Sequence, residues 1–233
     1  MTILDKIIAH KQEEVRQEKE AIPVSDLEKY PAFSRTCLSF RDYLTHPEKS
    51  GIIAEYKRAS PSKGLINGVA PIEETVGGYQ AAGASAVSVL TDTEFFKGSL
   101  RDLTAARSVL DIPLLRKEFI IDEYQLLQAK AYGADMVLLI AAVLDTDRLK
   151  ALSSAARSLG LQVLLEIHSL EELERSLIDT VDAIGVNNRN LNDFTVSLDR
   201  SFELAGRIPG HFLKISESGI SDPEAIRRLR EAG

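Results

Sequence analysis

The chain has 233 residues, 44% of them apolar and 27% charged, which suits one globular α/β barrel or two small domains. Its net charge of −7 disfavours non-specific nucleic-acid binding, so no nucleic-acid partner is expected. The single cysteine, Cys37, excludes an internal disulfide and every CxxC site, and the longest apolar run, residues 136–144, is too short to span a bilayer. These features, and an opening without a secretory signal, favour a reducing cytoplasmic compartment and no membrane partner.

The first predicted element is a charged amphipathic helix over residues 2–20, because apolar residues recur there at helical spacing. Pro23 and Pro31 punctuate the connector that follows, and residues 40–44 predict another helical turn. Residues 1–50 are therefore expected to form an N-terminal helical extension. The apolar positions of its first helix are Ile3, Leu4, Ile7, Ile8 and Val15.

From residue 51 onward, short apolar runs alternate with helical patterns. This alternation indicates βαβ units around a parallel sheet, and strands that are apolar on both faces fit a buried sheet. The predicted strands are residues 52–56, 86–90, 114–116, 136–140, 162–166, 183–186 and 212–215. The predicted helices are residues 72–82, 99–110, 123–132, 147–159, 170–178, 197–205 and 223–232.

Two folds use such alternation, the closed barrel and the open doubly wound sheet. Neither GxGxxG nor a P-loop occurs in the sequence, so the barrel is preferred. We expect an α/β protein in which residues 51–233 form units 1 to 7 of a (β/α)8 TIM barrel. The eighth βα unit is expected to be missing from this chain, and the natural protein to extend past Gly233. The seventh strand should then pair with the sixth and the first with the second, with no ladder between the first and the seventh.

Polar side chains recur where the predicted strands end. In a barrel these ends converge on one mouth, and a desolvated charge is costly unless it is paired or used. Any one of these residues is as easily a solvated loop charge, but the set favours an active site. The residues are Glu55 and Lys57 at the end of the first strand, Lys117 and Glu118 after the third, Glu166 at the end of the fifth, Asn187, Asn188 and Arg189 after the sixth, and Glu217 and Ser218 after the seventh.

Two stretches have the composition of anion sites. Residues 57–64 combine the cations of Lys57, Arg58 and Lys63 with hydroxyls and a glycine, which suits a phosphate or carboxylate. Ser218-Gly219 offers backbone N–H groups near a helix start. No metal site is expected, because the four histidines, His10, His46, His168 and His211, lack metal-ligand spacing.

Five motifs in chain order, together with the opening helix, resemble the indole-3-glycerol phosphate synthase family. The resemblance implies a carboxy-lyase of tryptophan biosynthesis acting on 1-(2-carboxyphenylamino)-1-deoxyribulose 5-phosphate. Ring closure, decarboxylation and dehydration would give indole-3-glycerol phosphate, without a metal or other cofactor. The motifs are Glu55-Tyr56-Lys57-Arg58-Ala59-Ser60-Pro61-Ser62-Lys63-Gly64, Leu115-Arg116-Lys117-Glu118-Phe119-Ile120, Leu165-Glu166-Ile167-His168, Gly185-Val186-Asn187-Asn188-Arg189 and Glu217-Ser218-Gly219-Ile220.

The same resemblance implies a role for each site residue. Lys117 would be the general acid on the ketone oxygen, Glu55 would orient Lys57 or Lys117, and the second acid or base is either Glu166 or Lys57. The catalytic set is Lys117, Glu166, Lys57, Glu55 and Asn187. The substrate-binding set is Ser60, Phe96, Phe119, Leu138, Arg189, Glu217, Ser218 and Gly219, in which Phe96, Phe119 and Leu138 wall the aromatic ring and Ser218-Gly219 holds the phosphate.

Two other functions remain open. A phosphosugar isomerase barrel would need an Asp/Cys acid–base pair, and Cys37 lies before the first strand. A binding-only barrel fragment would be consistent with a missing eighth strand. The expected partner in the preferred function is a phosphorylated small molecule, and the expected state is a monomer.

Overall fold

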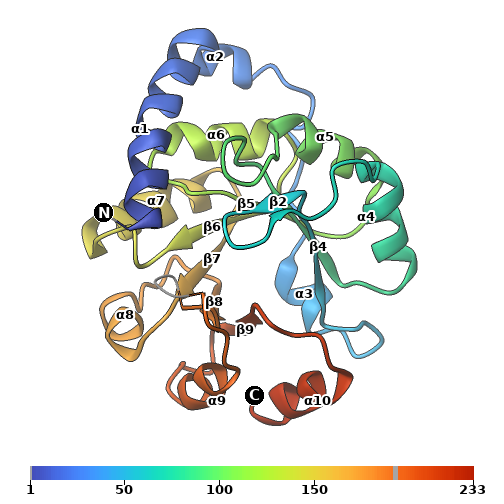
Figure 1. Cartoon of the computed structure of the whole chain (residues 1–233). Helices are drawn as coiled ribbons and strands as arrows, with labels where there is room; N and C mark the ends of the chain where they lie inside the picture. The colour runs from blue at the N-terminus through green and yellow to red at the C-terminus, as the bar shows by residue number, and fades with distance from the viewer. Residues whose placement is uncertain (1, 191–193) are drawn as a thin grey trace.

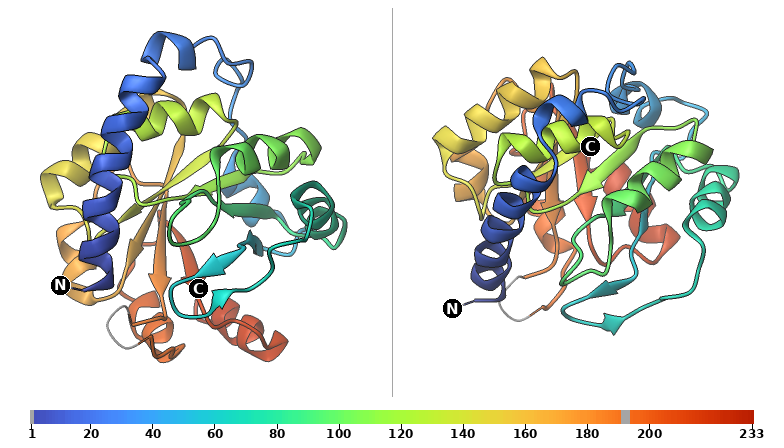
Figure 2. Two further views of the ribbon diagram at one scale, coloured as in Figure 1. Left: turned by 45° about the horizontal axis from the view of Figure 1, so that its top comes forward. Right: turned by 90° about the horizontal axis from the view of Figure 1, so that it is seen from above.

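The computed structural model describes residues 2–190 and 194–233. Its centre is a curled, all-parallel sheet of seven strands in the order β1-β4-β5-β6-β7-β8-β9, with helices on its outer face (Figures 1 and 2). Each strand begins and ends within two residues of its predicted bounds. The strands are β1 (Ile53–Tyr56), β4 (Ala86–Leu90), β5 (Leu114–Lys117), β6 (Met136–Ile140), β7 (Gln162–Ile167), β8 (Ala183–Asn187) and β9 (Leu213–Glu217).

One helix follows each strand of this sheet, and most of these helices begin at a side-chain cap. Ser99, Asp122, Asp145, Ser169 and Asp222 each accept a hydrogen bond from a backbone N–H of the first turn, which satisfies a donor that the helix itself leaves free. The helices are α4 (Ile72–Ala81), α5 (Leu100–Val109), α6 (Glu123–Ala131), α7 (Thr146–Ser158), α8 (Leu170–Arg175), α9 (Asp199–Ala205) and α10 (Pro223–Glu231).

The N-terminal segment contains α1 (Ile3–Ala21), α2 (Val24–Leu27) and α3 (Phe40–Leu44). The short helix α2 was not predicted, because its two flanking prolines suggested a plain connector; Pro23 instead stands at its N-cap. The antiparallel hairpin of β2 (Ala59–Ser60) and β3 (Gly64–Leu65) was also not predicted. In Figure 1, α1 and α2 lie beside α6.

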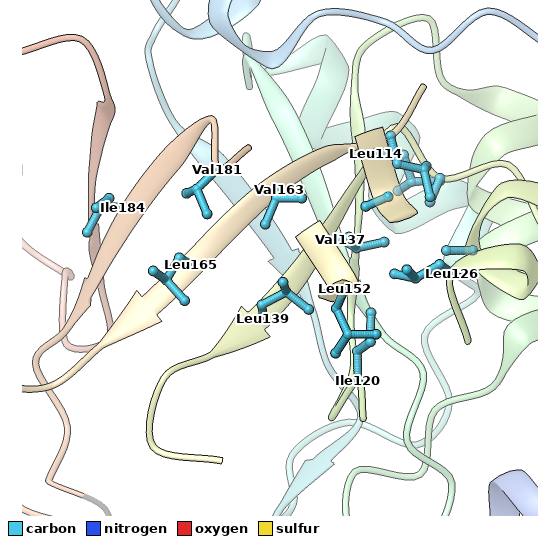
Figure 3. Packing of buried hydrophobic residues seen from close by; sticks show 14 of the residues in the cluster. Leu114, Ile120, Leu126, Val137, Leu139, Leu152, Val163, Leu165, Val181 and Ile184 are labelled. Carbon is cyan, nitrogen blue, oxygen red and sulfur yellow. The ribbon is translucent and has the colours of Figure 1, made fainter. Parts of the chain in front are cut away.

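Apolar side chains fill two layers, one on each face of the sheet. Val137 and Leu139 of β6 pack outward with residues of the covering helices such as Leu152 (Figure 3). The alternate residue Leu138 packs inward, in a cluster that also contains the fully buried ring of Phe40 from α3. The two-residue period of a strand therefore decides which side chains reach the interior of the curled sheet.

The sheet has two edge strands, β1 and β9. As predicted, β9 pairs with β8 and β1 with β4, and within residues 2–190 and 194–233 no ladder joins β1 to β9. A cavity of about 680 Å³ lies between these edges, lined by residues such as Ile53 and Ile215. Figure 1 shows α9 and α10 together at this side of the molecule.

Candidate active site

On five of the seven strands of this sheet, the inward-facing row ends in a polar residue at the carboxyl end, whereas on β4 and β6 it ends in a leucine and an isoleucine. On β5, Leu115 packs inward, so Lys117 two residues later shares its face. On β7, the inward Leu164 is likewise followed by Glu166. The same count places Glu55, Asn187 and Glu217 on the inner face of β1, β8 and β9. Five strands therefore bring a polar group to the same end of the sheet interior.

A cavity of about 230 Å³ opens at this end. It collects nearly every residue that the sequence nominated, from strands far apart in the chain. Of the residues expected to be catalytic or substrate-binding, Glu217 and Gly219 do not line it. The nominated residues that do are Glu55, Lys57, Ser60, Phe96, Lys117, Phe119, Leu138, Glu166, Asn187, Arg189 and Ser218.

Lys117 stands at the centre of the charges. Its ammonium nitrogen lies 2.7 Å from Oε2 of Glu217 and 3.2 Å from Oε2 of Glu55. Burial lowers the pKa of Lys117, but the carboxylates of Glu217, Glu55 and Glu166 outweigh it and raise that pKa well above its ordinary value. Lys117 is thus a half-buried cation that reaches the cavity and can donate a proton there.

Glu55 bridges two lysines. Its Oε1 accepts a hydrogen bond of 2.6 Å from Nζ of Lys57, while its Oε2 faces Lys117. Burial raises the pKa of Glu55, but the ammonium groups of Lys117 and Lys57 outweigh this effect and lower the pKa to about 2. Glu55 is therefore an anion at neutral pH and cannot itself supply a proton.

Glu217 reaches Lys117 only because Gly185 has no side chain. A Cβ at Gly185 would lie 2.1 Å from Oε1 of Glu217. That oxygen is buried and accepts no hydrogen bond from residues 2–190 or 194–233. Burial, together with the nearby Glu166, raises the pKa of Glu217 despite the ion pair with Lys117.

Outside the cavity, His168 lies next to Glu166. Nε2 of His168 lies 3.4 Å from Oε1 of Glu166, and its Nδ1 lies 3.5 Å from Oε2 of Glu172. The backbone N–H of His168 also donates to Glu172 at 2.6 Å. His168 is thus a loop residue held between two carboxylates.

The apolar wall of the cavity comes from two aromatic residues and the N-terminal helix. The rings of Phe96 and Phe119 lie 6.0 Å apart, tilted by 42°. Leu138 contributes from β6, and Ile3, Leu4 and Ile7 contribute from α1. Phe95 is not a lining residue and instead contacts the ring of His10.

The loop after β1 supplies hydroxyl and ammonium groups, with one correction to the sequence-based expectation. Lys57, Ser60 and Lys63 line the cavity. Arg58 does not: its guanidinium pairs with the carboxylate of Asp102 through two nitrogens and lies over the ring of Tyr56. A bidentate pair fixes a guanidinium strongly, so Arg58 is not part of the anion site.

The loop after β9 is in an unusual backbone conformation. Ser218 has φ +68° and Gly219 has φ +75°, and residues other than glycine rarely adopt this region. A Cβ at Gly219 would lie 2.3 Å from Cγ1 of Val196. The side-chain amide of Asn188 donates to the backbone oxygens of Glu217 and Ser218, which holds the turn. Ser218 thereby faces the cavity.

Three buried charges beside the site were not recognised as a group in the sequence. Lys11 of α1 is fully buried and forms ion pairs with Asp92 and Glu118, both also buried. One signal was available: Lys11 stands in the row Ile7–Lys11–Val15, which is spaced by four residues along the buried face of α1. A lysine on that row needs a buried partner.

Neither a metal cluster nor a membrane span is found in the part of the chain that the structure describes. No three His, Cys, Asp or Glu side chains gather there as metal ligands would. No helix there combines the length and apolarity that crossing a membrane requires.

Comparison with known proteins gives one family. The family model described as indole-3-glycerol phosphate synthase matches residues 4–233. A protein of that name from Bacteroides thetaiotaomicron is 52% identical over 231 residues, covering 99% of this chain and 88% of that protein. A protein of the same name from Desulfotalea psychrophila is 44% identical, covering 99% of this chain and 89% of that protein.

Solved structures agree on the fold. The N-acetylmannosamine-6-phosphate 2-epimerase of Clostridium perfringens matches with a TM-score of 0.55 at 15% identity, over 78% of this chain and 81% of that one. A chain from the tryptophan synthase α2β2 complex of Pyrococcus furiosus matches with a TM-score of 0.55, also at 15% identity, over 78% of this chain and 84% of that one. At this identity the likeness shows a TIM-barrel-like fold and nothing of the chemistry.

Proposed function

The chain belongs to the indole-3-glycerol phosphate synthase family, and from that premise we propose that its cavity closes the pyrrole ring of 1-(2-carboxyphenylamino)-1-deoxyribulose 5-phosphate. The observation that carries the proposal is the half-buried ammonium of Lys117, held between Glu217 and Glu55. In this reaction the aromatic carbon that bears the carboxylate attacks the ketone carbon. Loss of CO2 then restores the aromatic ring, and loss of water completes the pyrrole.

Lys117 is the proposed general acid of ring closure. As the new carbon–carbon bond forms, the ketone oxygen gains negative charge, and a nearby ammonium can transfer a proton to it. Its raised pKa keeps Lys117 protonated before the reaction. The two carboxylates fix its position without taking its proton in the resting state, which supports the assignment.

Glu55 is the proposed orienting anion and Glu166 the proposed base. Glu55 contacts both Lys117 and Lys57, so it can hold the two ammonium groups in one arrangement. Lys57, which donates to Glu55, has protons to give and no lone pair to receive one. Glu166 lines the same cavity with a carboxylate that no lysine contacts within ion-pair distance in the described residues. Glu166 can therefore take the proton released in the later steps, and Lys57 can assist departure of the hydroxyl.

The apolar wall and the polar loops bind the two halves of the substrate. Phe96, Phe119 and Leu138 would enclose the aromatic ring, which fixes the attacking carbon near the ketone and lowers the entropic part of the barrier. Asn187 and Arg189 would hold its polar groups, with Ser60 near an anionic group. Ser218 and Gly219 would bind the phosphate through their exposed turn.

The finer features of the fold are proposals of the same kind. We propose that residues 1–50 are an extension to a barrel formed by residues 51–233, and that a further strand between β1 and β9 closes this barrel into eight units. The two unpaired edges and the cavity between them support this. Adding a final βα unit should raise the melting temperature, since open edges are destabilising. We also propose that the protein is a monomer and that it acts in the cytoplasm.

Product identification tests the function. The purified protein is incubated with the substrate, and mass spectrometry and indole fluorescence follow the mixture. Indole-3-glycerol phosphate and one CO2 per molecule of substrate are expected. An isomerase would leave the mass of its substrate unchanged, and a binding-only protein would leave the substrate intact.

A further inference from the structure

We propose that Lys11, on the N-terminal helix, is a positioning residue that sets the aromatic half of the substrate pocket. It lies outside the cavity lining and acts through Asp92 and Glu118. The proposal rests on the function proposed above, because it assumes that Phe96 and Phe119 enclose the aromatic ring of that substrate.

Lys11 is the cation that joins three elements. Its ammonium nitrogen lies 2.7 Å from Oε1 of Glu14 on α1, 3.0 Å from Oδ2 of Asp92 after β4, and 3.0 Å from Oε1 of Glu118 after β5. Burial lowers the pKa of Lys11, but Glu118 and Asp92 outweigh it and hold that pKa above its ordinary value. These buried charges hold one arrangement, because moving any one of them would leave another buried charge without its partner.

Asp92 links Lys11 to the loop that carries Phe96. Its Oδ1 accepts hydrogen bonds from the backbone N–H groups of Phe95, at 2.7 Å, and Phe96, at 3.2 Å. The backbone oxygen of Asp92 accepts from the N–H of Gly98 at 2.8 Å. The Asp92 carboxylate, with one oxygen on Lys11 and the other on this loop, therefore fixes where the Phe96 ring enters the cavity.

Glu118 links Lys11 to the backbone of Phe119 in the same way. Its Oε1 accepts from the backbone N–H of Phe119 at 2.9 Å, and its Oε2 accepts from the hydroxyl of Thr91 at 2.7 Å. The side chain of Arg116 lies 3.6 Å from Oε2. Each aromatic residue of the cavity wall thus has its backbone N–H bound by a carboxylate that is paired with Lys11.

The contacts divide the site into a half that depends on Lys11 and a half that does not. The Phe96 and Phe119 loops belong to the first half. Ser218 and Gly219 belong to the second, because their turn is held by Asn188, which follows β8 and forms no hydrogen bond with Lys11, Asp92 or Glu118 in the described part of the chain. Removing the charge of Lys11 should therefore weaken binding of an aromatic ring more than binding of a phosphate.

The test uses two small probes of the two halves, anthranilate and inorganic phosphate, as competitive inhibitors of turnover. In Lys11→Met, we expect the inhibition constant of anthranilate to rise about tenfold, equivalent to about 1.4 kcal/mol, and that of phosphate to stay within about twofold. Lys11→Arg keeps the charge and should restore anthranilate binding. Lys19→Met is the matched control, because Lys19 lies on the same helix but pairs with Asp122 at the surface; neither constant should change.

Two results would overturn the proposal: an equal loss for both probes in Lys11→Met, which a general loss of structure produces, or unchanged anthranilate inhibition. If Lys11→Met does not fold, the variant Asp92→Asn tests the proposal in its place. It keeps an oxygen for the N–H groups of Phe95 and Phe96 but removes the ion pair with Lys11, so the same selective loss, smaller in size, is expected. A wild-type protein that turns over no substrate would instead refute the proposed function.

Discussion

Oε2 of Glu217 lies 2.7 Å from the ammonium nitrogen of Lys117, although the two residues stand 100 positions apart in the chain. The contact exists because both occupy the last inward position of their strands, β9 and β5, in a sheet curled far enough to bring those strands face to face. The fold thus places a carboxylate on the proposed acid without any local sequence motif that pairs them.

The first prediction concerns the space for this contact. Gly185→Ala should displace Glu217, because the added Cβ would lie 2.1 Å from its carboxylate oxygen. Turnover should fall by about 10²-fold, a typical cost of misplacing a group by about 1 Å. Steady-state kinetics measures it.

Gly77→Ala provides the matched control for that change. Gly77 lies in α4, and a Cβ added there would point into open space, with no neighbouring side chain of the described residues within 4 Å. This variant should therefore keep full activity and gain about 0.5–1 kcal/mol of stability. Equal activity in the two variants would show that the Glu217 position does not matter.

The second prediction concerns pH and His168. Burial lowers the pKa of His168, but Glu172 and Glu166 outweigh it and raise that pKa above the ordinary 6.5. A raised pKa adds stability that is fully present below pH 6.5 and is lost as pH rises through the folded-state pKa. His168→Gln should therefore lower the free energy of unfolding more at pH 6 than at pH 9.

Chemical denaturation at both pH values measures this difference, with the exposed His46 as the site of a control variant, His46→Gln. Arg200, whose charge opposes protonation of His168, remains in both proteins. An equal loss for His168→Gln at the two pH values would contradict the assignment of charge to this histidine.

The third prediction concerns the N-terminal segment. Deleting residues 2–43 should raise the Michaelis constant in a chain that still folds, because Ile3, Leu4 and Ile7 leave the cavity wall. It also removes Lys11 from Asp92 and Glu118. Circular dichroism would establish that the shortened protein is folded. If both the Michaelis constant and turnover are unchanged, the segment is a structural appendage.

Much of the architecture was predictable, because it depends on local patterns. Apolar runs predict the strands of a buried parallel sheet. Lys117 and Glu166 were found because each stands where such a run ends. The short hairpin after β1 escaped detection because its two-residue strands are too brief to show a period.

The pairing of side chains was less predictable, because it depends on residues distant in the chain. Arg58 belongs to a basic, hydroxyl-rich stretch, yet Asp102 of α5 turns it away from the cavity. Lys11 appeared as one more charge on a charged helix, and only its partners after β4 and β5 explain its burial. Such long-range ion pairs leave no periodic signal in the sequence.

The central claim is that Lys117 is the general acid, and a single-turnover experiment tests it most directly. Excess enzyme is mixed with substrate, indole fluorescence follows the chemical step, and substrate affinity is measured separately. Lys117→Ala should slow the chemical step by roughly 10²–10⁴-fold and leave affinity nearly unchanged, while Lys150→Ala, at an exposed position of α7, should match the wild type. Near-normal formation of the indole product by Lys117→Ala would contradict the account.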